Sequence, residues 1–512
     1  MTERQPNILI VMVDQLAPRF LPIHGHPLVQ APNLARLAAR GTVFERAYCN
    51  SPLCSPSRTA FMTGALPSRT GGYDNAAEFR ADIPTFAHYL RRLGYRTVLS
   101  GKMHFCGPDQ LHGFEERLTT DIYPADYGWT PDWDRPEERP SWYHNMSSVT
   151  EAGLCVRTNQ MDFDEEVAFA AERAIYDHVR GKDRRPFLMV ASLTHPHDPF
   201  AITRPFWDLY PHDAIDMPRV GAGDVALDPH SARIRHVCAM DARPVTEDEI
   251  RNARHAYYGA ISFCDAQLGR LLDALAATGL DDTAVLFLGD HGEMLGERGL
   301  WYKMSFFEGA CRVPLVVSAP GRFAPGRSRA AVSLVDVLPT LVELAGGDLG
   351  HLASPVDGRS LLPHLGGEGG HDEVLGEYLA EGAVAPIVML RRDRWKFVHS
   401  PADPDQLYDL EADPDELHNL AGLPAHAERV AGFGAEVARR WDLAALDRAV
   451  HESQRRRRLV DAALMTGTTK PWDYQPFRDA TRQYMRNTMD LDDLEAMARF
   501  PRVAAGAARG DP

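Results

Sequence analysis

The chain has 512 residues, of which 44% are hydrophobic and 25% are charged, and its formal net charge is −16. This length and composition predict a globular protein with one large domain and a smaller partner, or with two to three ordinary domains. The negative charge argues against nucleic acid as a partner, and the lack of any apolar run of about 18 residues argues against a membrane span.

The N-terminal residues lead directly into a predicted strand. Residues 7–13 read Asn-Ile-Leu-Ile-Val-Met-Val, a continuous apolar run typical of a strand buried on both faces. The run lacks a basic leader and a small-residue cleavage site, so it is not predicted to be a signal peptide. The seven cysteines include no CxxC pair, which fits unpaired thiols in a cytoplasmic protein.

Helical and strand patterns alternate over the first two thirds of the chain. Helices are predicted over residues 32–40, 84–93 and 163–180, and the capping box of Thr246 and Glu249 begins a helix that reaches about residue 278. Buried strands are predicted at residues 95–100, 187–193 and 284–288. This alternation predicts an α/β fold, with a large, mainly parallel sheet sandwiched by helices.

The pattern changes near residue 374. Short apolar runs at residues 387–391, 395–398 and 406–410 predict a small antiparallel sheet, followed by a helical stretch and a polar tail. We therefore expect a catalytic domain over 1–373, an α+β subdomain over 374–449 and a C-terminal tail over 450–512. The basic run from Arg455 to Arg458 is expected to be a solvated helix face or a subunit contact.

Polar clusters follow four of the predicted strands. Ligands of open α/β sheets bind beyond the carboxyl ends of the strands, so these clusters are expected to meet at one site. One such residue on its own is common in loops, whereas four clusters of metal- and oxyanion-binding types indicate a functional site. The residues are Asp14 and Gln15, Lys102 and His104, His195 and His197, and Asp290 and His291.

One motif near the N-terminus carries the most specific signal. Within residues 51–64, Cys54 is followed by Pro56, Arg58 and a Thr-Gly pair, and a helix is expected to begin at about Ser57. A single Cys is most often a small buried hydrophobe, but this spacing resembles the maturation signature of type I sulfatases, which share an alkaline-phosphatase-like fold. The resemblance implies that a formylglycine-generating enzyme oxidises Cys54 to formylglycine, whose hydrated aldehyde is the nucleophile.

A divalent cation is predicted beside this motif. Asp14, Gln15, Asp290 and His291 form a mixed oxygen and nitrogen set that suits a hard divalent cation, although either Asp on its own would be read as a helix cap. The resemblance adds the modified Cys54 to the ligands and implies Ca²⁺, with Mn²⁺ as the alternative. Sulfatases usually carry two acids where this chain has Asp14 and Gln15.

The resemblance also implies roles for the other polar residues. Arg58 and Lys102 would hold the formylglycine oxygens, and His104 would be the base that releases the covalent sulfate. His197 and Lys303 would bind sulfate and supply a proton to the leaving oxygen. His195 is interpreted as a structural histidine.

Other segments resemble one branch of this family. Residues 64–79, 119–133, 472–479 and 486–495 are similar to those of choline sulfatases, which implies hydrolysis of the small molecule choline-O-sulfate to choline and sulfate. The alternatives are an arylsulfatase, a phosphonate or phosphate ester hydrolase of the same superfamily, and a non-catalytic anion-binding relative that keeps the Cys54 thiol.

An aromatic loop is the candidate site for the substrate cation. Its aromatic residues are Tyr123, Tyr127, Trp129, Trp133, Trp142 and Tyr143. Aromatic faces and carboxylates bind quaternary ammonium groups, which cannot donate hydrogen bonds. The same aromatics could also serve only to pack the loop. The resemblance further implies a homo-oligomer, a dimer or tetramer, in which the tail helps to close the pocket. The predicted substrate-binding residues are Trp129, His144, Asn145, Tyr123 and Trp133 in or near the loop, and Trp472, Asp473 and Asp490 in the tail.

Overall fold

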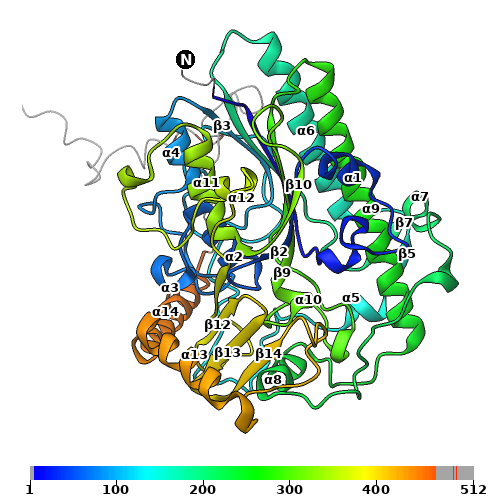
Figure 1. Ribbon diagram of the computed structural model, residues 1–512, viewed down its shortest axis with the longest axis vertical. Coiled ribbons are helices and arrows are strands. Elements are labelled where there is room, and N and C mark those ends of the chain that lie inside the picture. Colours follow the sequence, from blue (N-terminus) through cyan, green and yellow to red (C-terminus); the bar gives the residue numbers. More distant parts are fainter. Residues whose placement is uncertain (1–4, 469–487, 489, 491, 493–512) are drawn as a thin grey trace, which may run out of the picture. The chain divides into compact units, whose positions relative to one another are not determined.

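An eight-stranded sheet lies at the centre of the computed structural model, which describes residues 5–468, 488, 490 and 492 (Figure 1). The strand order is β10-β2-β9-β8-β1-β6-β3-β4, and every neighbouring pair is parallel except those that β9 makes with β2 and β8. The prediction of a large, mainly parallel sheet is confirmed. The strands are β1 (Ile8–Val13), β2 (Thr42–Tyr48), β3 (Arg96–Gly101), β4 (Glu116–Arg117), β6 (Phe187–Ser192), β8 (Ala284–Gly289), β9 (Arg312–Ser318) and β10 (Gly326–Ser333).

The middle strands are buried on both faces, which explains their continuous apolar sequences. Every residue of β1, β6 and β8 is buried. Val13 pairs with Gly289, and Ser192 pairs with both Met12 and Gly101. Because β1, β3, β6 and β8 end at the same level, the residues that follow them lie side by side.

Helices cover both faces of this sheet (Figure 1). One layer contains α1, α6 and α9, and the other contains α2, α4 and α11. Helix α9 begins at the predicted capping box, in which Thr246 and Glu249 bond reciprocally. The helices are α1 (Pro32–Ala38), α2 (Cys54–Thr63), α3 (Pro67–Thr70), α4 (Phe86–Arg92), α5 (Ser147–Thr150), α6 (Asn159–Arg180), α7 (Arg204–Trp207), α8 (Pro229–Val237), α9 (Glu247–Ala277), α10 (Glu308–Cys311), α11 (Val337–Leu344), α12 (Leu362–Leu365), α13 (Ala427–Arg440) and α14 (Leu443–Leu464).

The predicted small antiparallel sheet is also confirmed. It consists of β11 (Glu373–Tyr378), β12 (Ile387–Arg392), β13 (Trp395–Ser400) and β14 (Asp403–Asp409) in sequential order. Helix α13 packs Phe433 and Val437 against Phe397 and Leu407 of this sheet. A separate parallel pair joins β5 (Gly153–Cys155) to β7 (Ala201–Thr203). The three domain boundaries remain predictions.

Two details differ from the sequence expectations. Helix α2 begins at Cys54 rather than near Ser57, because Pro56 fits the first turn, where its missing N–H is not needed. Strands β2, β9 and β10 were not predicted. Within the described residues, no helix is long and apolar enough to cross a membrane.

Candidate active site

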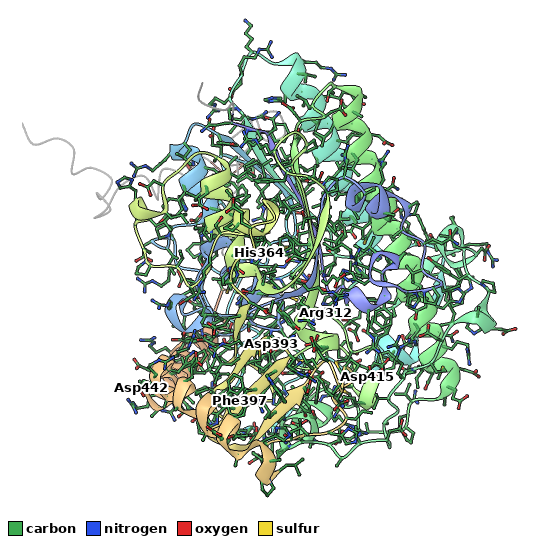
Figure 2. The ribbon with its side chains drawn as sticks, viewed as in Figure 1. Arg312, His364, Asp393, Phe397, Asp415 and Asp442 are labelled. Atoms are coloured by element: carbon green, nitrogen blue, oxygen red, sulfur yellow. The ribbon has the colours of Figure 1, made fainter. Side chains whose placement is uncertain are left out.

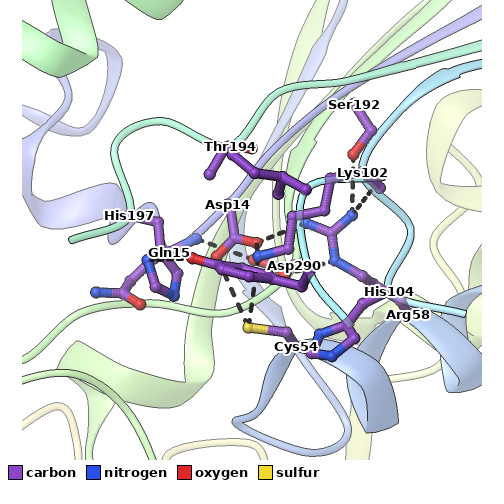
Figure 3. A network of polar contacts seen from close by, with 12 residues as sticks. Asp14, Gln15, Cys54, Arg58, Lys102, His104, Ser192, Thr194, His197 and Asp290 are labelled. Carbon is purple, nitrogen blue, oxygen red and sulfur yellow. Dashed lines mark hydrogen bonds and ion pairs between the residues drawn. The ribbon is translucent and has the colours of Figure 1, made fainter. Parts of the chain in front are cut away.

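The predicted polar clusters meet at the carboxyl edge of the large sheet, around Cys54 (Figure 3). Asp14 follows β1, Lys102 follows β3 and Asp290 follows β8. Gly101 allows the close approach that places Lys102 there. It has a φ of 103°, and a Cβ at this position would lie 2.0 Å from the Ser192 carbonyl oxygen. Only glycine fits both constraints.

Cys54 lies at the first position of α2 and is 2% exposed. Its Sγ is 3.1 Å from Nε2 of His291, 3.9 Å from Oδ1 of Asp14 and 3.9 Å from Nζ of Lys102. The thiol marks where the oxygens of a formylglycine hydrate would lie. A nucleophile here would face a carboxylate, an imidazole and an ammonium group at once.

Buried cations surround the two carboxylates. Arg58 contacts Oδ2 of Asp14 and Oδ2 of Asp290, each at 2.9 Å, and Lys102 contacts Oδ2 of Asp14. Burial alone would raise the pKa of Asp14, but the charges of Lys102 and Arg58 hold this pKa well below its ordinary value. Asp14 is therefore ionised in the folded protein.

The donor set fits a divalent cation. One ligand atom each from Asp14, Cys54, Asp290 and His291 lies within 4.8 Å of all the others, and all four residues are buried. Nδ1 of His291 lies 3.0 Å from the Gly292 carbonyl oxygen, which can only accept, so Nδ1 carries the proton. The Nε2 lone pair then lies 3.7 Å from Oδ1 of Asp14. Two acceptors that face each other in a buried site favour a cation between them.

Gln15 connects this site to Lys303. Nζ of Lys303 donates to Oε1 of Gln15 at 2.5 Å, and Nε2 of Gln15 donates to Glu293 at 2.6 Å. His197 is 2.9 Å from the same Nζ. The Gln15 amide oxygen keeps a second lone pair, and its role as a cation ligand stays a prediction.

His197 is held as an acceptor towards Lys303. Its Nδ1 lies 2.6 Å from the backbone carbonyl of Asp198, so Nδ1 carries the proton and Nε2 accepts from Lys303. Burial and the Lys303 charge lower the pKa of His197 well below its ordinary value. Burial would lower the pKa of Lys303, but negative groups around it, including Asp198 and Asp14, raise the pKa above its usual value. Lys303 is thus the protonated partner of the pair.

A cavity of about 260 Å³ opens beside Cys54. Predicted residues from both the core and the aromatic loop line it. Neither ring nitrogen of His104 has a hydrogen-bond partner in the described residues. The predicted lining residues are Cys54, His104, His197 and Lys303 from the core, and Tyr123, Trp129, His144 and Asn145 from the loop side.

Aromatic rings line part of this cavity. The Trp129 and Trp142 rings stack at 13° with centroids 6.3 Å apart, and the Tyr123 ring centroid lies 5.6 Å from that of Trp129. His144 stacks on Tyr302 at 4.2 Å. The lining thus combines an ammonium group, Lys303, with electron-rich aromatic rings.

Several predicted residues lie elsewhere. Trp133 is buried outside the cavity lining, and its indole N–H donates to the Ala380 carbonyl at 2.9 Å. Asp490 is exposed and accepts from the backbone N–H of Asp492. Trp472 and Asp473 fall outside the described residues. His195 points to Asp164, with Nδ1 2.7 Å from its carboxylate.

Asn75, Asp198 and Glu381 are among the lining residues that were not singled out from the sequence. Asn75 accepts the Ser55 N–H at the start of α2. Asp198 lies beside His144. Glu381 comes from the loop after β11, its Oε2 has no hydrogen-bond partner in the described chain, and burial raises its pKa to about 8. Asp198 belongs to the motif that supplied His197, but Glu381 carries no local signal because its loop is remote in sequence.

Helix α14 holds the aromatic loop in place. Arg457 makes two bonds to Asp74, of 2.7 and 2.6 Å, and one to Thr130 of 3.1 Å. Asp74 precedes Asn75, and Thr130 follows Trp129. Arg457 is 6% exposed, so the expectation of a solvated helix face is wrong for this residue. The Arg457 side chain is buried because its guanidinium group binds the buried Asp74 carboxylate.

The sulfatase family matches residues 6–347 of the chain. The chain belongs to the sulfatase family. The family match and the choline-sulfatase relative described below make this protein a sulfuric ester hydrolase. The C-terminal region of choline sulfatase enzymes matches residues 448–500, and that of N-sulphoglucosamine sulphohydrolase matches residues 296–440. The predicted family and branch are both confirmed.

This sulfatase has relatives in bacteria and animals. It is 52% identical to the choline-sulfatase of Rhizobium meliloti (strain 1021) over 511 residues, covering 98% of this chain and 100% of the relative. It is 31% identical to arylsulfatase K of Gallus gallus, covering 79% and 77%. Among solved structures, the phosphonate monoester hydrolase of Agrobacterium radiobacter superposes with a TM-score of 0.68 at 26% identity, covering 85% of this chain and 95% of that one. The sulfatase fold is therefore confirmed.

Proposed function

We propose that this sulfatase hydrolyses choline-O-sulfate to choline and sulfate. The observation that carries the proposal is the cavity beside Cys54, which is lined both by the ammonium group of Lys303 and by the stacked rings of Trp129 and Trp142. The relative that is 52% identical over the full length is a choline-sulfatase, which supports the same substrate.

The cationic groups suit the sulfate group. Nζ of Lys102 lies 3.9 Å from Sγ of Cys54, and Lys303 lines the same cavity, so these two ammonium groups would hold and neutralise sulfuryl oxygens. Formylglycine at position 54 would supply a hydrated aldehyde as nucleophile, and a divalent cation, Ca²⁺ or Mn²⁺, would supply Lewis-acid charge neutralisation. Asp14, Gln15, Asp290, His291 and residue 54 would hold that cation.

Proton supply belongs to Lys303 and His197. Choline is a poor leaving group, so its oxygen needs a proton as the S–O bond breaks. Lys303 is charged and bonded to Nε2 of His197, and either group can pass this proton to the leaving oxygen. His104, whose ring nitrogens have no partner in the described chain, would act as the base that frees the covalent sulfate.

The aromatic rings suit the trimethylammonium group. Trp129 and Trp142 offer ring faces, and Asp198 offers negative charge within the same cavity. Glu381 adds a second negative charge as pH rises through its pKa of about 8. These groups attract a quaternary cation without needing a hydrogen bond from it. An aryl sulfate would gain the ring contacts but not the charge attraction.

We also propose that the enzyme acts in the cytoplasm as a homo-oligomer, after maturation by a formylglycine-generating enzyme. The seven free cysteines fit a reducing compartment. Mass spectrometry of the peptide containing residue 54 tests the maturation, and light scattering tests the oligomeric state.

The first experiment compares kcat/KM for choline-O-sulfate, p-nitrophenyl sulfate and a phosphonate monoester on matured protein. We expect preference for choline-O-sulfate, and Trp129→Ala should raise KM for it roughly ten-fold, since a cation–π contact contributes about 1–2 kcal/mol. Trp395→Ala, in β13 and outside the cavity lining, is the control. Preference for the aryl ester or the phosphonate would overturn the proposal.

A further inference from the structure

A second cavity, of about 220 Å³, opens where the large sheet meets the small sheet. It shares no lining residue with the catalytic cavity. Its walls come from β2 and β9 of the large sheet and β12 of the small one, and Figure 2 labels Arg312 and Asp415 in this region. The charged lining residues are Arg19, Arg46, Arg219, Arg312, Arg391, Glu45, Glu308 and Asp415.

The carboxylates of this cavity are already paired. Asp415 pairs with Arg19 at 3.5 Å. Glu45 binds Arg327 and Arg329, which lie outside the lining. Glu308 accepts from Tyr48 and binds Lys396 at 3.0 Å. Arg46 pairs with Glu411 at 3.1 Å. Within the described chain, the remaining arginines Arg219, Arg312 and Arg391 have no ion pair.

Two of these three guanidinium groups are substantially removed from water. Arg391 is 1% exposed; its Nε donates to the Tyr48 hydroxyl at 3.2 Å and its Nη1 donates to the Asp393 carbonyl oxygen. Arg312 is partly buried; its Nη2 donates to the Glu45 carbonyl oxygen, and its Nε is buried with no hydrogen-bond partner in the described residues. Glu308 attracts both guanidinium groups but forms its own ion pair with Lys396, so their planar donors can still match the oxygens of an anion. Arg219 is exposed at the rim.

We propose that this cavity binds a small tetrahedral oxyanion, inorganic sulfate or phosphate, through Arg219, Arg312 and Arg391. Five arginines against three carboxylates give a local positive field in a chain whose net charge is −16. The cavity has room for such an ion, since a water molecule takes about 30 Å³ of liquid.

The position of the cavity links it physically to the catalytic edge. Gly309 of the cavity wall packs tightly against Gly292. A Cβ on Gly292 would lie 2.0 Å from the Gly309 carbonyl oxygen. Gly292 directly follows His291. An anion that braces this wall therefore stabilises the fold behind the catalytic turn.

Crystals soaked in selenate test the site directly through anomalous scattering. We expect a selenium peak within hydrogen-bonding distance of the three guanidinium groups, in addition to any peak beside Cys54. Arg312→Gln and Arg219→Gln should remove the first peak. Signal only beside Cys54, or only an adventitious ion at scattered surface sites, would overturn the proposal.

Thermal unfolding gives a second test in solution. Sulfate and phosphate are each titrated against chloride at equal ionic strength, and Tm should rise in wild type. Arg219→Gln, at an exposed residue, should lose at least half of that rise while kcat/KM is unchanged, and the ion that raises Tm identifies the source. Arg204→Gln, which is 70% exposed in its side chain, pairs with Asp208 and lies outside the cavity lining, should keep the full rise. An equal rise in wild type and in Arg219→Gln contradicts the proposal.

Discussion

Replacement of Arg457 by Met removes the ion pair that joins α14 to the catalytic half of the molecule. The Asp74 side chain of this pair is 0% exposed, and its carboxylate accepts two hydrogen bonds from Arg457. Loss of one partner leaves an uncompensated carboxylate, which costs about 3–5 kcal/mol. We expect Arg457→Met to lower the free energy of unfolding by this amount.

The same change should alter substrate binding. Arg457 fixes Asp74 next to Asn75 and Thr130 next to Trp129, so both walls of the cavity lose an anchor. About 5 kcal/mol, the top of this range, corresponds to several thousand-fold in an equilibrium constant, which sets the upper limit for the rise in KM for choline-O-sulfate. The effect on kcat should be smaller, because Lys303 and His197 do not contact this pair.

Urea unfolding and steady-state kinetics measure the two effects. Arg456→Met is the matched control, because Arg456 lies on the same helix and pairs only with Glu452 at the surface, which contributes about 0–1 kcal/mol. Asp74→Asn combined with Arg457→Met should recover part of the lost stability, since no unpaired charge remains. Equal stability and KM in the Arg457 and Arg456 variants would refute the reasoning.

Three further predictions concern the catalytic cavity. Burial raises the pKa of Glu381 to about 8, so the carboxylate forms as pH rises through that value. KM for choline-O-sulfate should then fall between pH 7 and 9, and this pH dependence should disappear in Glu381→Gln. Lys303→Met should reduce kcat for choline-O-sulfate by about 10²–10⁴-fold but affect p-nitrophenyl sulfate much less, because nitrophenolate leaves without a proton; equal losses would exclude the proton-donor role. Chelation should abolish turnover and lower Tm, and only a divalent cation should restore both. The Tm of Asp14→Asn should change little when that cation is added.

Local sequence signals account for the parts of the fold that could be predicted. The strands β1, β6 and β8 are buried on both faces and therefore apolar throughout, so their ends, and Asp14 and Asp290 after them, could be located. Strand β2 was not predicted because Glu45 and Arg46 interrupt its apolar pattern. Strand β10 lies at the sheet edge and begins with exposed residues.

Contacts between distant segments account for what the sequence did not indicate. Arg457 and Asp74 are 383 residues apart, and neither residue lies in a sequence motif that predicts the other as its partner. Trp133 shares its loop with Trp129, and composition cannot tell which indole faces the cavity. The structure distinguishes them, because the Trp133 N–H is bonded to Ala380 and Trp129 stacks on Trp142.

The burial of α2 has a consequence for when Cys54 can mature. All ten residues of this helix are buried, and His291, which covers the thiol, is synthesised 237 residues later. At about 5–20 residues per second, the segment around Cys54 emerges roughly 10–50 s before that cover exists. A modifying enzyme that needs an extended peptide has this interval during translation, and the finished fold then excludes it. Slower or faster elongation should therefore change the fraction of active enzyme made by a cell, without any change in the sequence.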